Sequence, residues 1–468
     1  MTLDMLFINP PWVVDNKDNI WRKIGSCLPS LGIAYIASVL EQDGRKVAIL
    51  DCTAEGLFDI NRIEKRLREY PTPRFVGFTA TTPIINNGLR IAKICRQVFP
   101  DAKIVFGGVH PSVMPEETLN NCEVDFVVID EGEITTRELV GGESPVNILG
   151  LSWKDSGKII HNPLRPLIEN LDQIPAPAYH LLPMKKYRPA LGSYKRLPVM
   201  SIFATRGCPG RCTFCYRTFR GKVRSRSAKN IIAEIKILRK DYGIREISFY
   251  DDTFTAFKDT VKEFCERLNS EKIDVTWSCF TRPDYIDFEL LKYMKNSGCH
   301  LILFGIESAD EQILKNVNKE VSLQQAKWAV KASRKLGIQT RASFMLGNPQ
   351  ETEETIKKSM EFVIKLDPDE VHFNIATAYP GTELFRWAKE KGYLISEDWS
   401  KYNMSEINMA LPTVSHETLK KYYKLAHRRF YLRPKIILRR LLKIRDFTQF
   451  LQEAKGFLAI LRVFKEQY

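Results

Sequence analysis

The sequence predicts an α/β protein with two parallel-sheet units in tandem, followed by a helical basic tail. Short apolar runs alternate with amphipathic helical stretches up to about residue 140, and the same alternation resumes near Val199. Continuously apolar strands that alternate with helices are typical of parallel sheets covered on both faces. We therefore expect a first unit at 1–140, a connecting segment at 141–198, a second unit at 199–410 and the tail at 411–468.

The first unit is predicted to be a doubly wound sheet. Its strands are expected at 5–11, 46–51, 75–82, 103–112 and 124–133, and its helices at 31–44, 60–70 and 86–100. Gly44 is expected to end the first helix. Such a sheet binds ligands at the carboxyl ends of its strands. The loops there, at 9–12, 79–87, 107–112 and 130–133, are rich in Gly, Pro, Thr and Asn.

The connecting segment has no clean hydrophobic period and carries many prolines, so we expect it to lie on the surface. In the second unit, six strands are predicted at 199–207, 246–252, 275–284, 300–308, 340–349 and 370–380. Amphipathic helices such as 228–243 and 323–337 separate them. Six successive strand–helix units predict a partial (β/α)6 TIM-type barrel, with its chemistry at the carboxyl ends of the strands.

The composition is that of an ordinary soluble globular protein, with 44% hydrophobic and 27% charged residues. There is no signal-peptide pattern and no apolar run that approaches roughly 18 residues, so we expect a cytoplasmic protein. Its ten cysteines would then stay mostly reduced. Clustered cysteines are accordingly expected to be metal ligands or catalysts rather than disulfides.

Three of the cysteines fall in "RGCPGRCTFCYR" (206–217), directly after the first predicted barrel strand. A cubane iron–sulfur cluster normally takes four cysteinates, so a set of three leaves one iron with an exchangeable position. A structural zinc site, the alternative, usually shows paired C-x2-C knuckles and four ligands. No second knuckle is present, because Cys265, Cys279 and Cys299 are isolated in the sequence.

The stretch "CPGRCTFCY" resembles the signature of radical S-adenosylmethionine enzymes. In that family the open iron binds the amino and carboxylate groups of S-adenosylmethionine, and an electron from the cluster frees a 5′-deoxyadenosyl radical. The resemblance implies that Cys208, Cys212 and Cys215 are the cluster ligands. It places Phe214 and Tyr216 beside the adenine.

Further cofactor contacts are implied by the same resemblance, at Asp251 and Asp252, Glu307 and Ser308, Arg341, and Gly347 with Glu351. The two aspartates would lie near the methionine amine, and Glu307 and Ser308 near the ribose hydroxyls. Arg341 would pair with the methionine carboxylate. Gly347 would belong to a loop around the adenine. For the acidic residues, a helix cap or a surface ion pair is the alternative interpretation.

The first unit resembles the cobalamin-binding domain of cobalamin-dependent radical S-adenosylmethionine enzymes. The supporting stretches, in chain order, are "NPP", "LPSLGIAYIASVLE", "GGVHPS" and "DEGE", so that the resemblance covers about 410 residues. It implies that Thr81 and Thr82 lie beneath the corrin and that Gly107 and Gly108 allow close approach of the backbone.

His110 is a candidate cobalt ligand, but the Asp-x-His-x-x-Gly loop of many cobalamin domains is missing. Members of the radical family commonly lack that loop. A buried, hydrogen-bonded histidine is therefore the other interpretation of His110. The domain as a whole could also have lost its ligand and only shape the substrate site. A dinucleotide-binding domain is not supported, since no G-x-G-x-x-G follows the first strand.

The net charge of +14 is concentrated in the tail, where 14 Lys and Arg face 4 Asp and Glu over the last 58 residues, a balance of +10. At helical spacing, Ile436, Ile437, Leu441 and Ile444 share one face, and Arg439, Arg440 and Lys443 cover the other. A basic amphipathic helix at a membrane surface and a helix docked on the barrel are both consistent with this pattern. Nucleic-acid binding is disfavoured because no recognisable RNA module is present.

Taken together, the resemblance implies an enzyme with a [4Fe-4S] cluster, S-adenosylmethionine and cobalamin. It would methylate an unactivated carbon of a small-molecule or lipid-like substrate, with electrons from a donor such as flavodoxin or ferredoxin. It would be cytoplasmic, with peripheral contact at the inner membrane face through the tail. The alternatives are a cyclase or rearrangement enzyme without methyl transfer, and a non-catalytic iron–sulfur or cobalamin sensor. The sequence contains no motif that encodes the substrate.

Overall fold

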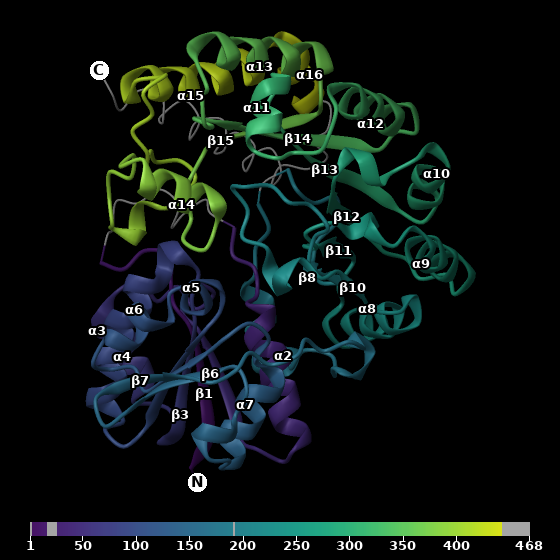
Figure 1. Ribbon diagram of the computed structural model, residues 1–468. Coiled ribbons are helices and arrows are strands. Elements are labelled where there is room, and N and C mark those ends of the chain that lie inside the picture. The colour runs from purple at the N-terminus through teal and green to yellow at the C-terminus, as the bar shows by residue number, and fades with distance from the viewer. Residues whose placement is uncertain (1, 16–25, 191, 442–468) are drawn as a thin grey trace.

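The computed structural model describes residues 2–15, 26–190 and 192–441. Two large sheets form the protein, a mostly parallel one in the N-terminal part of the chain and a parallel one in the barrel that follows it (Figure 1). The predicted fold class, a doubly wound sheet followed by a partial barrel, is therefore confirmed.

The first sheet has seven strands in the order β2-β1-β3-β4-β5-β6-β7. The first five, all parallel, are β1 (Leu3–Asn9), β2 (Val47–Asp51), β3 (Pro73–Thr79), β4 (Lys103–Gly107) and β5 (Phe126–Val128). The helices of this unit are α2 (Leu31–Gln42), α3 (Ile60–Leu67), α4 (Ile85–Val98), α5 (Val109–Val113), α6 (Pro115–Asn120) and α7 (Gly132–Gly141). Because β1 lies between β2 and β3, the strand order reverses beside it, and this is where such sheets bind ligands.

Alternation along β1 shows why both faces of this sheet are covered. Met5 and Phe7 enter one core with residues of α2 and α7, whereas Leu6 and Ile8 enter another with residues of α3 and α4. Successive side chains of a strand point to opposite faces. An uninterrupted apolar strand therefore requires helices on both faces of the sheet. Because helices cover both faces, a ligand binds at the carboxyl ends of the strands.

The expectation that 141–198 is an irregular connecting segment is wrong for its first part. Strands β6 (Leu151–Asp155) and β7 (Lys158–His161) form an antiparallel hairpin at the edge of the sheet, beside β5. Buried Trp153 anchors this hairpin in the core. The rest of the segment consists of irregular chain with short 3₁₀ turns. The domain limits drawn from the sequence stay a prediction.

All six predicted barrel strands are present, in the order β15-β14-β13-β12-β11-β8 and all parallel. They are β8 (Val199–Ile202), β11 (Glu246–Phe249), β12 (Thr276–Thr281), β13 (Cys299–Glu307), β14 (Gln339–Leu346) and β15 (Glu370–Ile375). The helices between them are α8 (Ala228–Tyr242), α9 (Lys258–Ser270), α10 (Phe288–Asn296), α11 (Glu311–Asn316), α12 (Leu323–Lys335) and α13 (Glu353–Leu366). They lie on the outside of the barrel (Figure 1).

Helix α8 illustrates how the sequence sets these elements. The Ser227 side chain accepts the amide hydrogen of Asn230 and caps the first turn, and Gly243 ends the helix in the left-handed conformation. Ile231, Ile235 and Leu238 recur at helical spacing and are buried against the strands. The polar face is left in solvent.

The chain then continues through α14 (Glu383–Glu390), α15 (His416–Tyr431) and α16 (Pro434–Leu441). Helix α15 packs on β15 and α13, and Phe430 and Ile436 are fully buried. The first part of the basic tail is therefore helical and docked on the barrel. Residues 442–468, which include Lys443 and Ile444, lie outside the described residues. Among the helices that are described, none combines the length and apolar character that a membrane crossing demands.

Candidate functional site

A cavity of about 380 Å³ opens at the carboxyl ends of the barrel strands, and the three clustered cysteines line it. Cys208, Cys212 and Cys215 lie in the segment 207–223, which we call the cysteine loop. The opposite wall comes from β12, β13, β14 and β15, at Phe280, Glu307, Ser343 and Asn374 among others. The sequence therefore predicted correctly that this loop lies on the face where barrels of this kind have their chemistry.

None of the three cysteines forms a disulfide. Cys208 and Cys212 are half-buried residues, Cys215 is an exposed one, and all three line the cavity. Burial raises the pKa of Cys212, although the charges of Lys319 and Arg282 oppose this effect. Burial, with the charge of Asp252, raises the pKa of Cys215 to about 12. At Cys212 and Cys215 the neutral thiol is thus favoured, as expected for residues that ionise when they bind a metal.

The arrangement of the thiols distinguishes between the two kinds of metal site. Across the described residues, no three His, Cys, Asp or Glu side chains are placed to hold one ion together. A tetrahedral zinc site needs that convergence, with sulfurs at about 2.3 Å from one metal. In a cubane cluster each cysteine binds a different iron, so three thiols spread around a cavity fit it. The cavity residues therefore fit a cluster better than a zinc ion.

Two cavity cations were not found by the sequence analysis. The Lys319 ammonium lies 3.2 Å from the Glu307 carboxylate, and both side chains are largely buried. The Arg282 guanidinium holds Asp284 through two hydrogen bonds of 2.9 and 3.0 Å and lies near Cys208 and Cys212. Both cations line the cavity. They offset negative charge that a set of three thiolates would bring.

The two adjacent aspartates have different surroundings. Asp252 lines the cavity and accepts a hydrogen bond of 2.8 Å from the Thr218 hydroxyl of the cysteine loop. Asp251 is fully buried and accepts hydrogen bonds from the Ala204 amide and the Thr205 amide and hydroxyl, where the chain leaves β8. Burial raises the pKa of Asp251 to about 7. Asp252 therefore lines the cavity, whereas Asp251 is buried and holds the chain that leaves β8.

Ser308 and Arg341, two further residues predicted to contact the cofactor, already have partners within the protein. Ser308 is buried, lies 3.5 Å from the Ser359 hydroxyl and accepts the amide of Asp310. Arg341 lines the cavity, but its Nε donates to Glu370 over 2.7 Å. It is therefore not free to form a fork with another carboxylate.

The surroundings of Gly347 explain why a glycine occupies this position. A Cβ atom at this position would lie 2.8 Å from the Leu419 side chain of α15. Its amide donates to the Glu351 carboxylate over 2.6 Å, and burial raises the pKa of Glu351 to about 7. The glycine's φ of +88° lies in the left-handed region that favours glycine, and this loop does not line the cavity.

The predicted residues of the first unit follow β3 and β4 at the carboxyl edge of the sheet. Thr81 is exposed and Gly107 is half-buried there. Gly108 has a φ of +95°, and a Cβ atom on it would lie 2.9 Å from the Ala80 carbonyl oxygen. Only glycine fits this close crossing of two loops. The two loops, which follow β3 and β4, therefore pack closely at the carboxyl edge of the first sheet.

His110 is fully buried, contrary to what a metal ligand open to a cofactor requires. Its Nδ1 lies 3.3 Å from the Thr82 hydroxyl, and its ring meets the edge of Trp399 with centroids 5.3 Å apart. Its Nε2 has no hydrogen-bond partner among the described residues. The structure therefore supports a packed histidine beneath the loop rather than one that faces a bound corrin.

We expect this histidine to make the protein sensitive to acid. Burial lowers the pKa of His110 to about 4, whereas the unfolded chain has the usual value of about 6.5. The unfolded state thus binds more protons between these values, so stability falls as the pH drops from 6.5 to 4, by roughly 3 kcal/mol. Urea unfolding of the wild type and of His110→Gln over this range measures it. Equal pH slopes for the two proteins would contradict the assignment.

The edge of the first sheet adjoins the cysteine loop. A Cβ atom on Gly381 would come within 2.6 Å of Val113 of α5 and within 3.2 Å of Tyr216. The Arg220 guanidinium of the cysteine loop lies 3.3 Å from Asp130 of the first unit. Both predicted ligand-binding edges therefore face a common region, with Phe214 and Tyr216 on the cavity wall.

Comparisons with known sequences agree with both halves of this arrangement. The family model of the B12 binding domain matches residues 19–140, and that of the radical SAM superfamily matches residues 202–363. An uncharacterised methyltransferase of Pyrococcus horikoshii is 38% identical over 93% of this chain and 94% of its own. The cytidylyl-2-hydroxyethylphosphonate methyltransferase of Streptomyces wedmorensis is 28% identical over 86% and 84%. The anaerobic magnesium-protoporphyrin IX monomethyl ester cyclase of Rubrivivax gelatinosus is 29% identical over 92% and 77%.

Among solved structures, the cobalamin-dependent S-adenosylmethionine radical enzyme OxsB superposes with a TM-score of 0.74 at 18% identity. The match covers 99% of this chain and 71% of that one. A B12-type sheet that precedes a partial barrel with three loop cysteines defines a class of radical enzymes with two cofactor-binding units. The chain belongs to the cobalamin-dependent radical S-adenosylmethionine family. Its cofactors, an iron–sulfur cluster, S-adenosylmethionine and cobalamin, are those that the sequence implied.

Proposed function

We propose that this protein is a methyltransferase that acts on an unactivated carbon of a small-molecule or lipid-like substrate. The observation that carries the proposal is that three unpaired thiols line one cavity beside the ligand-binding edge of a B12-type sheet. Two of the relatives named above are methyltransferases, and this supports methyl transfer as the reaction type.

Cys208, Cys212 and Cys215 would hold the iron–sulfur cluster, and the absence of a fourth cysteine from the cavity lining leaves one iron for S-adenosylmethionine. When bound, the cluster and S-adenosylmethionine supply a carbon radical, and cobalamin supplies a methyl group. The protein's own residues position these groups and exclude water. Lys319 and Arg282 lie near the thiols and would offset part of their negative charge, although each also pairs with a carboxylate, Glu307 and Asp284. Asp252 and Glu307 are the acceptors on the cavity wall for amino and hydroxyl groups.

Cobalamin would lie on the carboxyl edge of the first sheet, against Thr81, Gly107 and Gly108, whereas the predicted contact Thr82 is buried against His110. Thr81 is exposed on this edge, and Gly107 presents backbone without a side chain. His110 is fully buried, so we propose that it would not be a ligand of the cobalt.

Electrons would come from an external donor such as flavodoxin or ferredoxin. A cytoplasmic location with contact at the inner membrane face stays a prediction. Its support in the described part of the tail is that Leu438 is exposed on α16, a basic helix whose Lys435 and Arg439 pair with Asp367.

The experiment that tests the function uses the full chain, reconstituted anaerobically with iron, sulfide and hydroxocobalamin. With reductant and methyl-labelled S-adenosylmethionine, we expect both 5′-deoxyadenosine and S-adenosylhomocysteine, and label in a product when extract of the native host is added. Cleavage without label in any product would favour a cyclase or rearrangement enzyme. No cleavage at all would favour a sensor and overturn the proposal.

A further inference from the structure

The two ends of the cysteine loop meet in a narrow neck. Strand β9 (Thr205–Arg206) pairs antiparallel with β10 (Arg224–Ser225), so that Arg206 and Arg224 lie directly opposite each other. A Cβ atom on Gly207 would lie 2.3 Å from the Lys222 carbonyl oxygen. The whole loop that carries the three cysteines thus leaves the barrel at one point.

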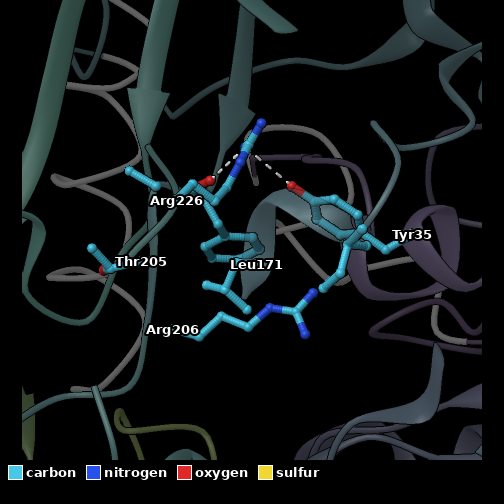
Figure 2. A pocket seen from close by; sticks show the side chains of 8 residues that line it. Tyr35, Leu171, Thr205, Arg206 and Arg226 are labelled. Carbon is cyan, nitrogen blue, oxygen red and sulfur yellow. Dashed lines mark hydrogen bonds between the residues drawn. The ribbon is translucent and has the colours of Figure 1, made fainter. Parts of the chain in front are cut away.

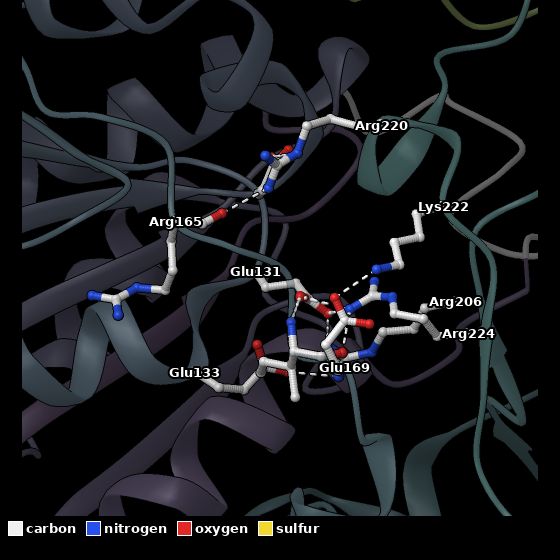
Figure 3. A network of polar contacts seen from close by, with 10 residues as sticks. Glu131, Glu133, Arg165, Glu169, Arg206, Arg220, Lys222 and Arg224 are labelled. Carbon is white, nitrogen blue, oxygen red and sulfur yellow. Dashed lines mark hydrogen bonds and ion pairs between the residues drawn. The ribbon is translucent and has the colours of Figure 1, made fainter.

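Both arginines at this neck bind a single carboxylate of the first unit. Glu131 follows β5, at the carboxyl edge of the first sheet. Its carboxylate accepts a hydrogen bond of 2.7 Å from Arg206 and two of 2.9 Å from Arg224. The second terminal nitrogen of Arg206 lies 2.6 Å from Glu133 (Figure 3). Glu131 and Glu133 of the first unit therefore hold both ends of the cysteine loop. We call these two glutamates, with Arg206 and Arg224, the clamp.

The clamp is buried and balanced in charge. The side chains of Glu131 and Arg224 are each 4% exposed, that of Glu133 is 6% exposed and that of Arg206 is 14% exposed. Burial alone would raise the pKa of Glu131, but hydrogen bonding by Arg224 and the charge of Arg206 outweigh it and lower that pKa. Two cations and two anions thus compensate one another away from water. Removing one partner of such a set leaves an uncompensated buried charge, which is strongly unfavourable.

Aromatic contacts extend the clamp in both directions. The Arg206 guanidinium lies over the Tyr35 ring of α2, 5.4 Å from the centre of the ring. Arg226 lies beside the same tyrosine (Figure 2), and its Nη1 donates to the Tyr35 hydroxyl over 3.4 Å. Inside the cysteine loop, the Phe219 ring lies 5.9 Å from the Arg206 guanidinium and 5.1 Å from that of Arg224. Phe219 has a φ of +53°, a conformation that a non-glycine residue keeps only where its surroundings hold it.

We propose that Glu131 and Glu133 are positioning residues, which fix the three-cysteine loop against the edge of the first sheet where the second cofactor would bind. The inference rests on the proposed function, because it concerns the alignment of the two cofactor-binding units. Displacements of about 1 Å between reacting groups are enough to lower rates about 100-fold. A charged clamp at the neck of the loop holds that alignment without touching either cofactor.

The first test is hydrogen–deuterium exchange on the reconstituted full chain. Glu131→Gln should speed the exchange of amides in residues 207–223 by about tenfold, because local opening then costs less. Amides of α9 and α10 should be unaffected. The matched control is Glu169→Gln, since Glu169 pairs with Lys222 of the same loop over 2.5 Å but is exposed. It should leave the exchange of the loop unchanged.

The second test separates positioning from a general loss of structure. Under reductant and without substrate, S-adenosylmethionine yields 5′-deoxyadenosine by cleavage and S-adenosylhomocysteine by methylation of cobalamin. Glu131→Gln should lower the ratio of S-adenosylhomocysteine to 5′-deoxyadenosine about tenfold, since only the methyl transfer needs both units aligned. Its iron content and the visible spectrum of bound cobalamin should match the wild type.

Loop exchange within twofold of the wild type, or an equal fall of both products, would overturn the clamp. If Glu131→Gln does not fold, Glu133→Gln decides, because it removes only one of the two partners of Arg206 and should show the same effects at smaller size. A wild type that forms neither product would instead contradict the proposed function. The exchange experiment would still decide the clamp in that case.

Discussion

Replacing Cys208, Cys212 or Cys215 by Ala should each reduce the formation of 5′-deoxyadenosine to background. Each thiol would bind its own iron, so that two remaining cysteines cannot hold a cubane that also keeps a free corner. The iron content after reconstitution should fall with the activity. The circular dichroism spectrum should not change, because the cysteine loop lies outside both large sheets. The measurement is product quantification on anaerobically reconstituted protein.

Two cysteines outside the cavity serve as matched controls. Cys122 is exposed in the first unit, and Cys279 is buried within β12. Neither lines the cavity. Cys122→Ala and Cys279→Ala should therefore keep their iron and their activity. Full iron content and activity in any of the three loop variants would refute the ligand assignment and, with it, the proposed function.

The fold was predictable where hydrophobic periodicity is local and strong. All six barrel strands and the five parallel strands of the first sheet are apolar runs, which burial on both faces requires. The hairpin of β6 and β7 was missed because prolines surround it and its strands are half polar. A turn signal was present nonetheless. Ser156 and Gly157 both have positive φ, 49° and 81°, which is the two-residue turn that joins antiparallel strands.

The candidate site was predictable only where its residues are close together in the sequence. The three cysteines lie within eight positions, so their spacing alone indicates their chemistry. Arg282 reaches the cavity from the end of β12 and Lys319 from the segment between α11 and α12, and no spacing rule connects them to the cysteines. The role of Gly347 stays a prediction. The family resemblance implied a contact with the adenine, but the loop of Gly347 does not line the cavity and its φ of +88° is by itself a reason for glycine.

Glu246 stabilises the barrel end opposite the cavity, and Glu246→Ala should be strongly destabilising. The carboxylate is fully buried at the start of β11 and accepts hydrogen bonds from the amides of Lys195 and Arg196, at 2.8 and 2.7 Å. The Thr276 hydroxyl and the His300 ring bind it as well, each at 2.8 Å. Alanine would leave the buried Thr276 hydroxyl and His300 ring without this acceptor, whereas the more exposed amides of Lys195 and Arg196 can bind water, and the loss costs about 3 kcal/mol. The thermal midpoint should fall by roughly 10 °C.

The loss should also reach the cysteine loop, because Lys195 and Arg196 directly precede β8, the strand that leads into it. Differential scanning calorimetry of the full chain measures the midpoint. Glu263→Ala is the control, since it removes a carboxylate of the same barrel that forms an exposed ion pair with Arg267 within α9. Its midpoint should match the wild type, as exposed pairs contribute little. Equal midpoints for Glu246→Ala and Glu263→Ala would show that the donors around Glu246 find other acceptors, and that this buried carboxylate does not hold the strand that positions the site.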